Sequence, residues 1–260
     1  MAKSIKQKMG KFYIITTVGI AVALLTVGKY FIHESGLEFI VLNSILGSVI
    51  SSSIFITGFL LSGVFSDYKE ADKIPSEIRS SLESILGEGD ALKRKDPSFD
   101  NNKIRTIIKK FVQEFEEGLN EVNNHSHLDH AMEAIKDLDL VFDDMEARGV
   151  PPNYMTRIKS EQSHLRKMLL RVYHIQKTNF VPSVSVLVQS IVIVVIVLLA
   201  FVVAEASVGI ILFAVLSYLL IYTMQLIHVL EKPFRKGRDD TSDDVSIFLL
   251  RELSNSLDAK

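Results

Sequence analysis

Residues 37–66, LEFIVLNSILGSVISSSIFITGFLLSGVFS, form the stretch that most constrains how this chain folds, because it is long and almost uncharged. Glu38 is its only charged residue. As an α-helix, about 30 residues would rise roughly 45 Å, which exceeds the ~30 Å hydrocarbon core of a bilayer. The stretch therefore predicts one long membrane-spanning helix.

One face of this predicted helix carries small and aromatic residues, which recur at steps of three and four. They are Ser44, Ser48, Ser51, Phe55, Gly58, Phe59 and Ser62. Apolar residues occupy the other faces, among them Ile40, Leu42, Ile45, Ile50, Ile56 and Leu60. Such a face either packs closely against a neighbouring helix, the commonest use of small residues in membranes, or lines a pore. The stretch alone favours packing.

The composition indicates a membrane protein with a soluble part. Of the 260 residues, 48% are hydrophobic and 23% are charged, so the two kinds must be segregated along the chain. A net charge of −2 argues against a nucleic-acid partner. The absence of cysteine excludes disulfides, thiolate metal sites and cysteine nucleophiles.

A first span is predicted at about residues 12–32, which are apolar over the length that a bilayer requires. We interpret it as a retained span because no convincing signal-peptide cleavage site follows it. Lys3, Lys6, Lys8 and Lys11 place the N-terminus in the cytoplasm by the positive-inside rule. Residues 1–66 thus form a first hairpin, with spans at about 12–32 and 37–66, that returns the chain to the cytoplasm at Asp67.

Residues 67–179 are charged and have helical periodicity, which predicts a cytosolic helical domain with no strand. The first predicted helix starts at Pro75 and ends near Gly87, and a loop over residues 87–102 follows it. The next helix is marked by Ile104, Ile107, Ile108, Phe111, Val112, Phe115 and Leu119. The third begins at a capping box at Ser126, carries Ala131, Ala134, Ile135, Leu138, Val141, Phe142 and Met145, and ends at Gly149. The fourth covers about residues 154–177.

A second hairpin is predicted over residues 180–230, with spans at about 182–204 and 208–230. Lys232, Arg235, Lys236 and Arg238 follow it and again indicate the cytoplasmic side. Residues 231–260 form a cytosolic C-terminal segment, with a short amphipathic helix through Val245, Phe248, Leu249 and Leu253. The predicted fold class is therefore an all-α multi-pass protein of the cell's inner (plasma) membrane. It has four transmembrane helices in two hairpins, a cytosolic helical bundle between them, and both termini in the cytoplasm.

The sequence offers little catalytic chemistry, so we expect no enzyme. It contains no phosphate loop, HExxH motif or nucleophile elbow. His125, His127 and His130, with Asp129, flank one predicted helix start and could supply zinc ligands. Their spacing is not a specific zinc signature, and a solvated helix cap is the favoured interpretation.

Three segments resemble the bestrophin channel family, in particular its prokaryotic branch. IFITGFLLSGVFSDYKEADKIPSEIRSSL looks like the end of the family's second membrane helix, with Gly58, Phe59, Tyr68 and Pro75 as the matching residues. MLLRVYHIQKTNFVPSVSVL is similar to the entry into its third span, near Pro182. LEKPFRKGRDDTSDD looks like the segment after its last span, although Lys232 stands where asparagine is expected.

This resemblance implies an oligomeric ion channel, a homopentamer, that conducts small inorganic ions passively across the lipid bilayer. Anions such as chloride are the expected ions. The second transmembrane helix would line the pore through Ser51, Phe55, Gly58, Phe59 and Ser62, with an apolar neck formed by the phenylalanines. The alternative is a membrane-anchored scaffold or sensor whose cytosolic domain binds a partner.

The resemblance also raises the question of calcium. In animal relatives an acidic cluster after the last span helps to bind Ca²⁺, and Asp239, Asp240, Asp243 and Asp244 stand at the matching place. Lys232 brings a cation where a neutral oxygen ligand is expected. We therefore expect weak or absent calcium binding and no required cofactor.

Overall fold

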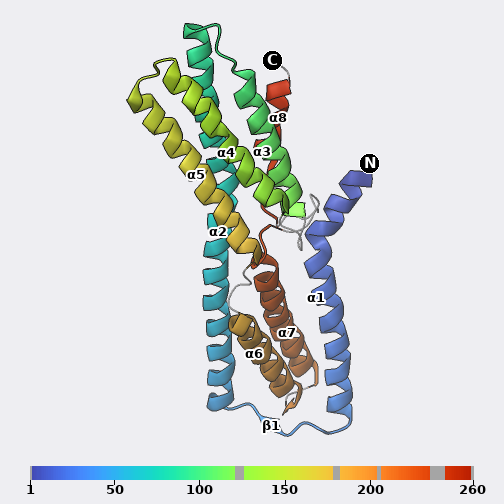
Figure 1. The fold of residues 1–260 in the computed structure, drawn as a ribbon. Coiled ribbons are helices and arrows are strands. Elements are labelled where there is room, and N and C mark those ends of the chain that lie inside the picture. Colours follow the sequence, from blue (N-terminus) through green and yellow to red (C-terminus); the bar gives the residue numbers. More distant parts are fainter. Residues whose placement is uncertain (1, 121–125, 178–181, 204–205, 235–243, 259–260) are drawn as a thin grey trace. The chain divides into compact units, whose positions relative to one another are not determined.

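The computed structural model describes residues 2–120, 126–177, 182–203, 206–234 and 244–258, and this part of the chain is almost entirely helical (Figure 1). The helices are α1 (Ala2–Glu34), α2 (Ser44–Lys95), α3 (Asn102–Asn120), α4 (Ser126–Ala147), α5 (Pro152–Lys177), α6 (Pro182–Ala200), α7 (Ala206–Leu230) and α8 (Phe248–Asp258). Two short strands, β1 (Ile40–Val41) and β2 (Val202–Val203), pair in parallel. The predicted all-α class is confirmed.

The chain divides into two compact units. Among the described residues, the first unit contains 2–68 and 182–232, and the second contains 69–177, 233–234 and 244–258. The apolar helices belong to the first unit. Three helices are long and apolar enough to cross a membrane, through Ile14–Glu34, Ser44–Lys95 and Ser207–Leu230, while the apolar part of α6, Val184–Ala200, is shorter.

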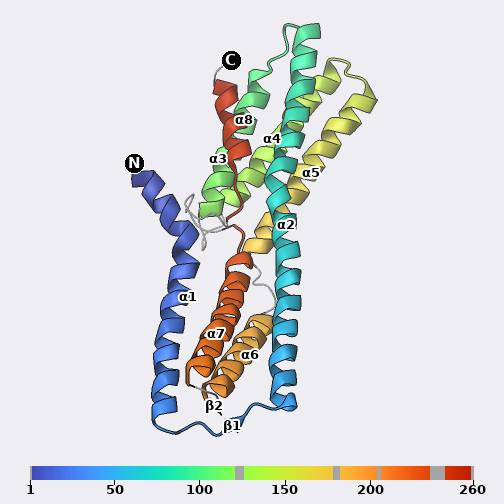
Figure 2. The ribbon, with the colours of Figure 1, turned by 180° about the vertical axis from the view of Figure 1, so that it is seen from behind.

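Helix α7 is the centre of the first unit, and Figure 2 shows it between α1 and α6. On one side, Ile14, Val18 and Val22 of α1 pack against Tyr218 and Tyr222 of α7. On its other side, buried residues of α2, α6 and α7 form one apolar cluster. They include Leu46, Ile50, Val64, Val188, Val192, Val195, Phe213, Leu220 and Ile227. Apolar packing of this kind holds membrane helices together without a hydrophobic effect between them.

The helix predicted from residue 37 in fact begins at Ser44, so that expectation was wrong by about two turns. Asn43 caps the helix, with its side-chain oxygen accepting a hydrogen bond from the Leu46 N–H at 2.9 Å. Before it, Ile40 and Val41 pair with Val202 and Val203. Both strands lie outside residues 67–179, for which no strand was predicted, and two residues are too few to show an alternating pattern.

Helix α2 also continues past Pro75 to Lys95, where a new helix and then a loop were predicted. Proline removes one backbone hydrogen bond and usually bends or ends a helix. Here burial outweighs that cost, because the apolar stripe of Ala71, Ile74, Ile78 and Leu82 continues through the buried Pro75. The predicted loop over residues 87–102 shrinks to the six residues between α2 and α3.

The second unit is a bundle with a dense apolar core. The residues predicted for the core faces of α3 and α4 lie inside it, led by Phe111, Phe115, Leu138 and Phe142, which are at most 1% exposed. Gly149 has φ +78° and terminates α4, as its position predicted. In α8, Leu250, Leu253 and Leu257 face the core. Phe248 was predicted to lie on the apolar face, but its side chain is 59% exposed.

Candidate functional site: the exposed face of α2

The membrane part of α2 has one buried and one exposed face within its own chain. The buried face consists of Leu46, Ile50, Ser53, Thr57 and Val64, each at most 9% exposed. Successive helical residues turn by about 100°, so these positions share one side. The Thr57 hydroxyl donates to the Ser53 carbonyl at 2.7 Å, which satisfies a buried polar group without a partner helix.

All five residues predicted to line a pore lie on the opposite, exposed side. Ser51, Gly58 and Ser62 are exposed, and Phe55 and Phe59 are 73% and 71% exposed. Phe55 and Phe59 lie about 40° apart around the helix and one turn apart along it, whereas Thr57 lies on the far side from both. We call Ser51, Phe55, Gly58, Phe59 and Ser62 the α2 face.

The α2 face is not a packing surface within one chain. In the part of the chain that the structure describes, a side-chain carbon added at Gly47, Gly58 or Gly63 would meet nothing within 4 Å apart from the helix's own backbone and chain neighbours. Close packing against another described helix of the same chain is therefore excluded at these glycines. The face is available for another copy of the chain, for lipid or for a water-filled path.

Two of the apolar residues that were placed on the other faces of the predicted helix contribute to the core of the unit. Ile50 is 9% exposed, and Leu60 packs against the apolar cluster of α2, α6 and α7. Both lie on the Thr57 side of the helix, which the neighbouring helices α6 and α7 cover. Ile56, at 39% exposed, remains on the outer surface as predicted.

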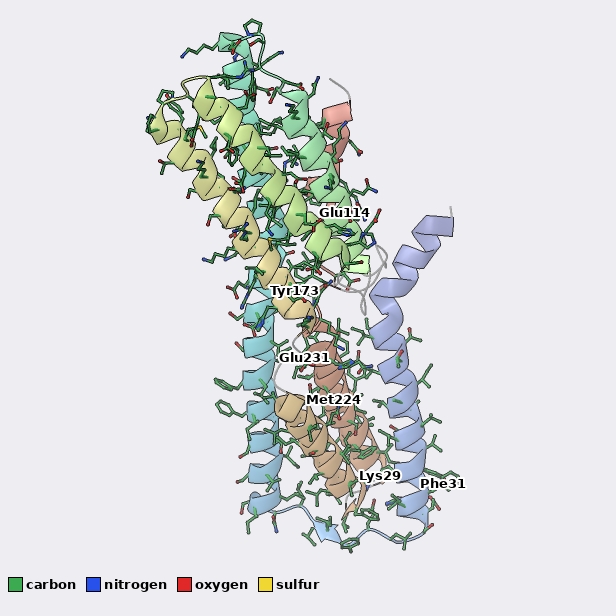
Figure 3. The ribbon with its side chains drawn as sticks, in the orientation of Figure 1. Lys29, Phe31, Glu114, Tyr173, Met224 and Glu231 are labelled. Carbon is green, nitrogen blue, oxygen red and sulfur yellow. The ribbon has the colours of Figure 1, made fainter. Side chains whose placement is uncertain are left out.

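A buried ion pair fixes the chain just before α2. Lys29, near the end of α1, donates to Oε1 of Glu38 at 2.5 Å and to the carbonyl oxygens of Ala200 and Val202 at 3.1 and 2.7 Å. His33 Nδ1 lies 3.1 Å from Glu38 Oε2. Figure 3 shows Lys29 at this end of the helices. No sequence motif singles out this group, although a lysine and a glutamate flanking a short link between two spans could have indicated it.

The two other predicted sites are the acidic cluster after α7 and the histidine cluster at the start of α4. Asp239, Asp240 and Asp243 lie outside the described residues, and Asp244 is half-buried, so the acidic cluster stays a prediction. His125 also lies outside them. His127 and His130 do come together, but their carboxylate neighbour is Glu114 of α3 and not Asp129.

Comparison with known proteins shows which fold this is. No family model and no curated protein sequence matches the chain. Solved structures do match. A bacterial bestrophin homologue from Klebsiella pneumoniae has a TM-score of 0.75 at 13% identity, covering 94% of this chain and 97% of that one. A single-substitution variant described in the same way gives 0.71 at 14% identity, with 94% and 98% covered. A structure described only as a membrane protein variant gives 0.72 at 14% identity, with 94% and 97% covered.

The chain therefore has the fold of bacterial bestrophin homologues over nearly its whole length. At this identity the likeness establishes the fold alone and carries no residue roles across. What the α2 face can do therefore depends on the chemistry of its own residues.

Proposed function

We propose that this chain is a bestrophin-type ion channel that assembles as a homopentamer, with the α2 face of each copy turned toward a central path. The fold shared over 94% of the chain supports this proposal. The observation that carries it is the α2 face itself, which is exposed in one chain although it belongs to a helix apolar enough to cross a membrane.

The chemistry of the α2 face suits a pore with a narrow apolar neck. Phe55 and Phe59 are one turn, or about 6 Å, apart along the helix. Five copies would place ten rings around the path, with Ser51 before them and Ser62 beyond them. Apolar constrictions of this kind gate by losing and regaining water, so conduction would be passive and would open as the neck widens.

We propose that the conducted ions are small inorganic anions such as chloride. Aromatic rings carry partial positive charge at their edges, so rings that present their edges to the path favour anions over cations. The α2 face has no ionised side chain to impose a stronger preference. Selectivity set by ring edges alone would be modest.

The proposed topology has four spans in two hairpins, in the inner (plasma) membrane, with both termini in the cytoplasm. The basic residues near the N-terminus and after α7 support it. At 17 residues, the apolar part of α6, Val184–Ala200, is at the short end of what spans a bilayer. Residues 67–179 would then form a cytosolic domain around the entry to the path.

The competing function is a membrane-anchored scaffold or sensor in which the α2 face only joins copies or contacts lipid. Two measurements on detergent-purified protein separate the two functions. Native mass spectrometry should show five chains, and liposomes containing the protein should release chloride down its gradient. A monomer or dimer without flux would contradict the channel and favour the scaffold. No catalytic step and no cofactor is part of the proposal.

A further inference from the structure

Glu114, His127 and His130 form a compact cluster of metal-ligating groups in the second unit. Glu114 lies on α3, as labelled in Figure 3, and the two histidines lie in the first turns of α4. Nδ1 of His127 is 2.7 Å and Nδ1 of His130 is 3.5 Å from Oε2 of Glu114. One ligand atom from each of the three residues lies within 4.8 Å of the others.

The fold holds these three residues in place from both helices. His127 and His130 are three apart and so share a face of α4. One turn beyond Glu114, α3 approaches α4 so closely at Gly118 that an added side-chain carbon would lie 2.7 Å from a methyl carbon of Leu128. Leu128, next to His127, is 2% exposed, and Phe115, next to Glu114, is fully buried. The backbones that carry the ligands are therefore set by core packing.

The ligand types and their spacing match zinc better than calcium or magnesium. Zinc accepts imidazole nitrogen and carboxylate oxygen at about 2.0–2.2 Å in tetrahedral sites, which places neighbouring ligand atoms about 3.3 Å apart. The two separations from Oε2 of Glu114, 2.7 Å to His127 and 3.5 Å to His130, lie on either side of that value. Calcium and magnesium prefer sites built from oxygen alone, so two imidazoles select against them.

A fourth ligand position has a candidate on the same face of α3. Oε2 of Glu117 lies 3.3 Å from Nδ1 of His127, and its side chain is 44% exposed. Glu114 and Glu117 are three apart, as His127 and His130 are, so each helix contributes one i, i+3 pair. A tetrahedral ion would take Glu117 or a water molecule as its fourth ligand.

We propose that Glu114, His127 and His130 bind a zinc ion that joins the end of α3 to the start of α4. The ion adds a metal bond between two helices that already pack together. It stabilises the second unit by an amount that grows with the logarithm of the ratio of the zinc concentration to the dissociation constant. It takes no part in conduction, and the proposal stands independently of the channel function.

The test uses the full-length chain in detergent, stripped of metal with a chelator and then titrated with zinc chloride. We expect one zinc bound per chain, a higher unfolding temperature with zinc but not with magnesium, and an X-ray absorption spectrum that shows two imidazole ligands. His127→Ala and His130→Ala should each weaken zinc binding on the order of tenfold or more.

His164→Ala is the matched control, because His164 also faces a carboxylate, with Nε2 3.6 Å from Oε2 of Glu77, but belongs to no group of three possible metal ligands among the described residues. It should bind zinc like the unmodified chain. Glu114→Gln serves where an alanine variant fails to fold, since it keeps the side-chain shape and removes the charge. Absence of binding at micromolar zinc, or equal affinity in the His127→Ala and His164→Ala variants, would overturn the proposal.

Discussion

Lys29 and Glu38 form a buried ion pair at the turn between α1 and α2, with side chains only 2% and 8% exposed. The same lysine donates to the carbonyl oxygens of Ala200 and Val202, so one side chain joins the end of α1, the link to α2 and the end of α6. This polar group closes the end of the first unit at the point where α2 begins.

Removing one member of this pair should destabilise the protein strongly. Lys29→Met leaves Glu38 buried without its cation, and such losses cost about 3–5 kcal/mol. The double variant Lys29→Met with Glu38→Gln should recover part of that loss, because no charge is then left unpaired. Unfolding in detergent, followed by circular dichroism, measures both. Equal stability of the single variant and the unmodified chain would show that the pair contributes nothing.

The proposed topology can be tested at Ser98, in the short connection between α2 and α3. A cysteine introduced there is the only thiol in the chain. It should resist a membrane-impermeant maleimide in intact cells and react once the membrane is opened. Labelling from outside intact cells would place residues 67–179 on the wrong side and contradict the proposed orientation.

Calcium gating is proposed to be weak or absent, because Lys232 brings a cation where a neutral oxygen ligand is expected. Chloride flux in liposomes should change little when calcium is added or chelated. Tight, stoichiometric binding that disappears in the Asp239→Ala and Asp240→Ala variants would contradict this expectation.

Asp96, just after the end of α2, should make a pH-dependent contribution to the stability of the fold, because it pairs with Arg148, just after the end of α4. Hydrogen bonds from Ser98, and then from Arg148, hold the pKa of Asp96 below its usual value of 3.8. A carboxylate whose pKa is lower in the folded state stabilises the fold above the usual pKa, and this contribution is lost as the pH falls through the folded-state pKa. Asp96→Asn should therefore lower the unfolding temperature more at pH 7 than at pH 3. An equal decrease in unfolding temperature at pH 7 and at pH 3 would show that the carboxylate charge of Asp96 does not cause it.

How much of this molecule could be predicted from the sequence depends on how locally each feature is encoded. The core faces of α3 and α4 follow from a helical period that residues such as Phe111 and Phe142 repeat without interruption. The α2 face was likewise predicted, since residues three and four apart must share a side. What it faces in an assembly is not encoded in one helix, so its pore role stays a prediction.

Features set by distant contacts were missed. The late start of α2 depends on pairing with Val202 and Val203, which lie some 160 residues further along the chain. The continuation through Pro75 depends on tertiary burial that overrides a local helix breaker. Glu114 is separated from His127 by a helix end, so only the packing of α3 on α4 brings the carboxylate to the histidines.

The central claim is that Phe55 and Phe59 form the neck of an ion path, and single-channel recording in planar bilayers tests it most directly. The double variant Phe55→Ala with Phe59→Ala removes both rings from the α2 face and should raise the conductance or leave the channel constitutively open. Ile56→Ala is the matched control, because Ile56 lies between them on the same helix and off that face, and its current should match that of the unmodified chain. The contradicting result has two parts: most of the double variant fails to assemble, and the protein that does assemble conducts like the unmodified chain. That result would assign both rings to packing between chains.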